Sequence, residues 1–168
     1  MSDFRPVYPF LSWDEAQRKI ASIKAQGGKA VSTNGCFDIL HVGHVALLEE
    51  ARKLGDFLIV GINSDASVKK LKGPSRPLNS ENSRAVVLRA LRCVDAICLF
   101  EQDTPVEWLQ KIQPSAHVKG GDYKAEDLPE NTLVKSWGGE IVILPFIEGH
   151  STTSIIDRAK NIFCIPKS

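Results

Sequence analysis

The feature that most constrains the fold is an alternation of short apolar runs with segments of helical period. Continuous apolar runs at 57–62 (FLIVGI) and 96–100 (AICLF) indicate strands that are buried on both faces. Segments 13–26, 42–53 and 81–92 space their apolar residues at helical intervals. Strands that alternate with helices predict a parallel sheet covered on both faces by right-handed crossovers. We therefore expect an α/β fold, a single Rossmann-like domain with a mostly parallel sheet.

Weaker signals complete this alternation. Further strands are expected at 29–33, 116–118 and 140–144, and further helices at 104–112, 130–137 and 151–163. In the 104–112 helix, Thr104 is the expected cap and Pro105 the first helical residue. The length of 168 residues suits one domain over 1–168, interpreted as an N-terminal helical extension (1–27) followed by a core (28–163).

Charge and cysteine content disfavour several classes of protein. The 21 basic and 20 acidic side chains give a net charge of +1, which argues against nucleic-acid coating and against binding to a membrane surface. No apolar run approaches the ~18 residues of a membrane span. The four cysteines show no CxxC spacing, which disfavours a zinc knuckle or a disulfide framework. A reducing cytoplasm is the expected location.

The stretch NGCFDILHVGH lies where a strand should end and a helix begin, the place where parallel sheets bind ligands. Gly35 allows a close turn, and His41 and His44, three residues apart, should share one face of the helix start. The free N–H groups of that helix start favour an anion. We therefore expect a phosphate site, although His-x-x-His with Cys36 could instead bind a metal ion.

These residues, together with GHSTTSI, resemble the cytidylyltransferase-like branch of the nucleotidyltransferase superfamily, which carries an HxGH element and an S-T-T-x-I element at a helix start. The blocks LIVGINSDASVKKLKGPSRPLN, VLRALRCVDAICLFEQDTP and VKGGDY are similar to the adenylyltransferases that make ADP-heptose. The resemblance extends over residues 28–163. It implies transfer of AMP from ATP to a heptose 1-phosphate by direct in-line attack, with Mg²⁺ held by the nucleotide phosphates. It also implies a homodimer that supplies an activated sugar for lipopolysaccharide.

The resemblance also implies roles for individual residues. Catalytic roles fall to His41, His44, Lys72 and Arg84. Nucleotide contacts fall to Asn34, Gly35, Cys36, Phe37, His41, His44, Lys119, Gly120, Gly121, Asp122, Tyr123, Ser151, Thr152 and Thr153. Candidates for binding the sugar phosphate are Asp38, Asn63, Asp65, Lys69, Arg76 and Asn79. We expect Lys69, Lys70 and Lys72 in a mobile basic loop that closes over the phosphates, although a solvated lysine cluster explains them equally well.

Two alternatives stay open. A CTP-dependent enzyme of the glycerol 3-phosphate type shares the HxGH and STT elements, but it carries an arginine where this chain has Phe146. A nucleotide-binding sensor without turnover would not need both histidines, the lysines and Arg84 together. The STTS segment, read by itself, could be no more than a helix cap.

Overall fold

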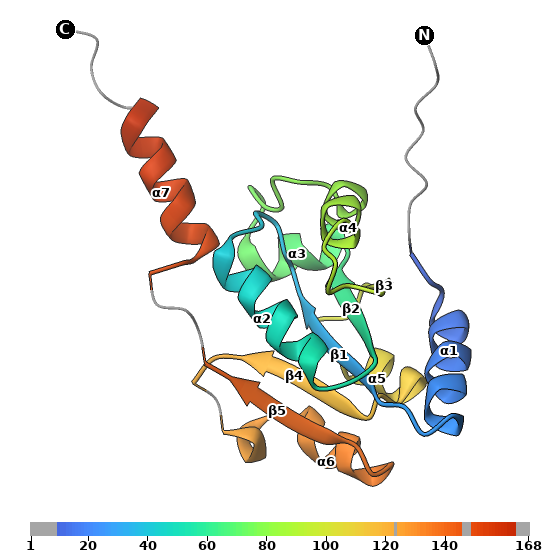
Figure 1. Ribbon diagram of the computed structural model, residues 1–168. Coiled ribbons are helices and arrows are strands. Elements are labelled where there is room, and N and C mark those ends of the chain that lie inside the picture. The colour runs from blue at the N-terminus through green and yellow to red at the C-terminus, as the bar shows by residue number, and fades with distance from the viewer. Residues whose placement is uncertain (1–9, 123, 146–148, 164–168) are drawn as a thin grey trace, which may run out of the picture.

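The computed structural model describes residues 10–122, 124–145 and 149–163 and is built around a parallel sheet (Figure 1). Its five strands are β1 (Ala30–Gly35), β2 (Phe57–Asn63), β3 (Ala96–Phe100), β4 (Ala116–Gly120) and β5 (Glu140–Leu144). They lie in the order β3-β2-β1-β4-β5, and every pairing is parallel. The predicted α/β, Rossmann-like fold is confirmed.

The helices are α1 (Trp13–Ala25), α2 (Val42–Lys53), α3 (Asp65–Lys72), α4 (Glu81–Arg89), α5 (Val106–Ile112), η1 (Ala125–Asp127), α6 (Glu130–Ser136) and α7 (Thr152–Phe163). Two local expectations were wrong. The lysine-rich segment is helix α3 and not a loop, because Ser64 caps it by accepting a hydrogen bond from the Ser67 N–H at 3.1 Å. Helix α5 begins at Val106, with Pro105 in the cap position in place of Thr104.

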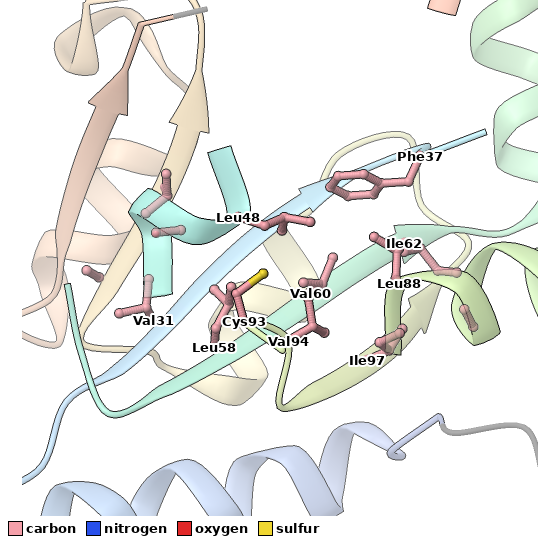
Figure 2. Close-up of a cluster of buried hydrophobic side chains, with 14 residues drawn as sticks. Val31, Phe37, Leu48, Leu58, Val60, Ile62, Leu88, Cys93, Val94 and Ile97 are labelled. Atoms are coloured by element: carbon pink, nitrogen blue, oxygen red, sulfur yellow. The ribbon is translucent and has the colours of Figure 1, made fainter. Parts of the chain in front are cut away.

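Helices cover both faces of the sheet. On one face α2 and α4 pack through Leu48 and Leu88 against the cluster that contains Val60 and Ile62 of β2 (Figure 2). On the other face lie α1, α5 and α6, and Trp108 of α5 is fully buried. A methyl group on Gly61 would lie 2.7 Å from the Trp108 ring, so β2 needs glycine where this helix approaches it. No helix in the described ranges is long and apolar enough to cross a membrane.

The strand order reverses at β1. This strand pairs with β2 on one side and with β4 on the other, so the chain leaves β1 and β4 in opposite directions. In such sheets the loops beyond these carboxyl ends diverge and leave room for a ligand. Helix α7 starts beside this point, where the Thr152 hydroxyl donates to the Ile39 carbonyl at 3.4 Å, and it then extends away from the sheet (Figure 1).

Candidate active site

A cavity of about 1000 Å³ opens at the carboxyl ends of the strands. Segments that follow all five strands contribute to its walls, as does the start of α7. The predicted site residues that line it are Asn34, Gly35, Cys36, Phe37, Asp38, His41, His44, Asn63, Lys72, Arg76, Lys119, Gly120, Ser151, Thr152 and Thr153. Most residues selected from the sequence therefore meet at one place.

Some predicted residues lie elsewhere. The described residues that do not line the cavity are Asp65, Lys69, Asn79, Arg84, Gly121 and Asp122. Tyr123 and Phe146 lie outside the described residues. The roles proposed for these positions therefore depend on indirect effects or stay predictions.

Sequence reasoning missed several residues of the cavity wall. They are Leu47, Leu71, Asp103, Thr104, Pro105, Leu128, Glu130, Pro145, Gly149, His150 and Ser154. Asp103 and Thr104 follow β3, so the strand-end rule that selected other residues could have found them. No local signal marks Glu130, because it belongs to helix α6 and reaches the cavity only through the tertiary fold.

The two histidines form a stacked pair at the start of α2. His41 occupies the cap position with extended backbone, and the ring centroids of His41 and His44 lie 3.8 Å apart with an interplanar angle of 24°. The Phe37 ring lies 5.0 Å from that of His44. A Cβ on Gly43 would come within 3.1 Å of the His41 ring, so glycine leaves space for the stack. The prediction that both imidazoles share one face is confirmed.

Burial sets the protonation of this pair. It lowers the pKa of His44 to about 4, helped by repulsion from His41 and opposed by the Ile39 carbonyl. Burial, followed by repulsion from His150, also lowers the pKa of His41. Both rings are therefore neutral at pH 7. The Nδ1 atoms of both are buried and have no hydrogen-bond partner among the described residues.

The buried carboxylate of Asp38 organises the loop after α3. It is 3 % exposed and accepts hydrogen bonds from Arg76 Nε at 2.5 Å, Leu78 N at 2.8 Å and Asn79 N at 2.9 Å. Burial alone would raise its pKa, but these donors hold the pKa below its usual value. Asp38 thus fixes Arg76 at the cavity wall. The carboxylate oxygens of Asp38 already accept hydrogen bonds from other groups of the protein.

Arg84 joins four segments behind the cavity. Its side chain is almost fully buried and donates to the carbonyls of Asn79 (3.1 Å), Cys36 (2.5 Å) and Asn63 (2.8 Å) and to Asp65 Oδ1 (2.8 Å). These bonds use four of the five guanidinium N–H groups. The structure therefore gives Arg84 the contacts of a brace, while its predicted contact with phosphate is untested.

A buried ion pair lies at the point where the strand order reverses. Lys119 Nζ lies 2.7 Å from Glu130 Oε1 and donates to Asn34 Oδ1 at 2.9 Å. All three residues line the cavity. This places a fixed cation in the wall of the cavity that the histidine pair also lines.

The arrangement suits anions. Hydroxyl groups of Ser151, Thr152 and Thr153 and the N–H groups at the start of α7 line the same cavity as the start of α2. Cys36 is a poor nucleophile, because burial raises the pKa of its thiol. Within the described ranges, no group of three or more His, Cys, Asp and Glu side chains is placed to hold a metal ion.

Two curated proteins illustrate what this chain is similar to. The bifunctional protein HldE of Trichlorobacter lovleyi is 52% identical over 139 residues, which cover 83% of this chain and 28% of that protein. HldE of Streptomyces coelicolor is 51% identical over 146 residues, 87% of this chain and 32% of the relative. The chain thus spans less than a third of the length of these curated relatives.

A solved structure is also similar. The lipopolysaccharide core biosynthesis protein from Thermoplasma volcanium GSS1 has 29% sequence identity and a TM-score of 0.60, over 74% of this chain and 100% of that one. A family model described as cytidylyltransferase-like matches residues 32–158, which contain the histidine pair, the Lys119 segment and the start of α7. The chain belongs to the cytidylyltransferase-like family.

Proposed function

We propose that this protein transfers AMP from ATP to a heptose 1-phosphate and releases ADP-heptose and pyrophosphate. The observation that carries the proposal is one cavity in which the stacked His41–His44 pair and the hydroxyl-rich start of α7 both lie. The similarity of about 50% identity to bifunctional HldE proteins supports the heptose substrate and ATP.

The cavity offers a separate place to each substrate. Near β4 and β5, Gly120, Leu128 and Pro145 provide an apolar wall suited to a nucleotide base. Beyond β2 and β3, Lys72 and Arg76 offer cations for the phosphate of the sugar. The hydroxyl-rich sugar would meet the polar side chain of Thr104. With the histidines between the two, the reacting phosphates would meet over the start of α2.

The reaction is a direct displacement at the α-phosphorus. A phosphate oxygen of the sugar phosphate attacks, and the bond to the bridging oxygen breaks so that its electron pair leaves with pyrophosphate. Catalysis then depends on aligning two anions and stabilising charge on the α-phosphate and the leaving group. The histidine rings, the two helix starts and the cavity cations would supply this stabilisation.

Mg²⁺ would enter with the triphosphate and help to neutralise its charge. Of the cavity carboxylates, Asp38 and Glu130 are already ion-paired. Asp103 lines the cavity and has no ion pair or hydrogen bond to another described side chain, so it is the residue we would assign to water molecules around the ion.

We place the protein in the cytoplasm, where ATP is available and where the free thiols of Cys36, Cys93 and Cys98 would persist.

We also propose a homodimer, supported by α7, which leaves apolar surface uncovered: Ile162 is 67% exposed. Light scattering on the purified chain, coupled to size exclusion, would distinguish a dimer from a monomer.

An initial-rate assay of pyrophosphate release tests the proposal. With Mg²⁺ present, ATP and CTP are each combined with heptose 1-phosphate and with glycerol 3-phosphate. We expect turnover with ATP and heptose 1-phosphate. Turnover with CTP and glycerol 3-phosphate would favour the cytidylyltransferase alternative, and nucleotide binding without pyrophosphate release from any pair would favour a sensor.

A further inference from the structure

We propose that Glu130 is a positioning residue that holds the Lys119 ammonium group against the bound nucleotide. The inference rests on the proposed function, because it assigns Lys119 a contact with the nucleotide of that reaction. Glu130 itself would act through Lys119 and would not need to touch the phosphates.

Glu130 and Asn34 fix the Lys119 ammonium group in the cavity wall. Glu130 is 2 % exposed, yet it forms part of the cavity wall. The Lys119 side chain is 18% exposed, and its Nζ is held at 2.7 Å by Glu130 and at 2.9 Å by Asn34. An ammonium group has three N–H donors. Two are directed to these partners, which leaves one for a ligand in the cavity that Lys119 lines.

The trio formed by Asn34, Lys119 and Glu130 lies where two neighbouring strands end. Thr33 pairs with Val118 in the sheet, so the next residues, Asn34 and Lys119, lie side by side at the carboxyl ends of β1 and β4. Glu130 reaches them from the first residue of α6. The trio therefore spans the point where the strand order reverses, and parallel sheets bind their ligands there.

The buried Lys119–Glu130 pair is better explained by ligand binding than by stability. A buried ion pair contributes little net stability, because desolvation of both charges offsets their attraction. A fixed cation has a different benefit: a lysine that is already ordered does not lose side-chain freedom when it meets an anion. Lys72 provides the contrast, because it is exposed in the last turn of α3 and has no ion pair among the described residues. Lys119 is thus prepared for binding before the nucleotide arrives.

The test uses Glu130→Gln, Lys119→Met and the double variant. Glutamine keeps the shape of the side chain and removes its charge. Glu126→Gln is the matched control, because Glu126 is an exposed carboxylate in η1, close in sequence, that does not line the cavity. Three quantities are measured for each: the melting temperature, the Kd for Mg·AMPCPP by calorimetry, and kcat/KM for ATP.

We expect Glu130→Gln and Lys119→Met each to weaken AMPCPP binding and to lower kcat/KM by about tenfold. This is the effect expected for the loss of one strong charge-assisted contact. The double variant should be no worse than Lys119→Met alone, and Glu126→Gln should match the wild type. Unchanged binding and kcat/KM in folded Glu130→Gln would overturn the inference, as would a double variant whose loss is the product of the two single losses. If Glu130→Gln does not fold, the double variant, which carries neither charge of the pair, is compared with Lys119→Met. Equal AMPCPP binding in the two supports the inference, and weaker binding by the double variant overturns it.

This test separates the inference from the proposed reaction. A wild-type protein that binds AMPCPP but does not turn over heptose 1-phosphate would refute the proposed acceptor, and the binding arm would still decide the role of Glu130. A wild-type protein that binds neither AMPCPP nor ATP would overturn both.

Discussion

The two sides of the cavity contain similar polar residues but use them differently. Near β1 and β4, the Nδ1 atoms of His41 and His44 have no partner among the described residues, and Lys119 retains one N–H for a ligand. Near β2 and α4, the side chains of Asp38 and Arg84 are almost fully used by other protein groups. A position near a strand end does not distinguish a residue that binds the ligand from one that only holds the fold together. Hydrogen-bonding groups that the protein leaves unused do distinguish the two.

The largest expected effect is on catalysis, and it comes from the side of the cavity near β1 and β4. His44→Ala should lower kcat/KM about a thousandfold, because it removes a fixed polar group beside the reacting phosphate, worth ~4 kcal/mol. The fold should be largely retained, since His44 lies in the cavity wall. Steady-state kinetics and thermal melting check this. Val42→Ala is the control, because Val42 is exposed at the same helix start and lies outside the cavity wall. A melting point that falls as severely as the rate would contradict this role.

On the braced side, the expected loss is of stability. Arg84→Met should lower the free energy of unfolding by ~3 kcal/mol, because it leaves three carbonyls and Asp65 without their buried donor. Urea denaturation measures this. Arg89→Met on the same helix should cost less than ~1 kcal/mol, since Arg89 is exposed and makes one hydrogen bond, to the Val94 carbonyl. Unchanged stability with a large loss of kcat would instead support the catalytic role that the family resemblance implies for Arg84.

The lysines of α3 give a smaller contrast within one helix. Lys72 lines the cavity, whereas Lys69 does not. Lys72→Met should lower kcat/KM by about tenfold, as expected for loss of one exposed cation near a phosphate, and Lys69→Met by less than about twofold. Kinetics of the two variants at low and moderate salt check this. Equal losses in both would mean that α3 moves on binding and brings Lys69 into the site.

The last expected effect is a dependence of stability on pH. The unfolded state binds a proton at His44 near pH 6.5, whereas the folded state resists protonation until the pKa of about 4. Stability from the neutral ring is therefore present above pH 6.5 and is lost as the pH falls towards 4. We expect His44→Asn to reduce the loss between pH 7 and pH 5 by ~2 kcal/mol, because about 1.5 pH units separate the unfolded pKa from pH 5 and each is worth ~1.4 kcal/mol. Urea titrations at both pH values measure this, and identical losses in wild type and variant would contradict a buried neutral His44.

The parts that could be predicted from sequence are those set by local geometry. Apolar runs located the strands, and a separation of three residues at a helix start was enough to pair His41 with His44. The Lys119–Glu130 pair could not be predicted, because it depends on how α6 packs beside β4. Helix α3 was missed because its lysines obscured a cap at Ser64 and a single buried apolar residue, Val68. The bracing role of Arg84 needed its depth in the fold, which helical spacing does not report.

The central claim is direct transfer without a covalent intermediate. His41 and His44 line the cavity as a stacked pair and are assigned to stabilising charge on the α-phosphate, so no bond between a ring nitrogen and phosphorus is required. The most direct test uses one diastereomer of ATPαS with heptose 1-phosphate and determines the configuration at the phosphorus of the product by ³¹P NMR. A single displacement predicts inversion. Retention would require two displacements, and therefore a nucleotidyl-enzyme intermediate that contradicts this account.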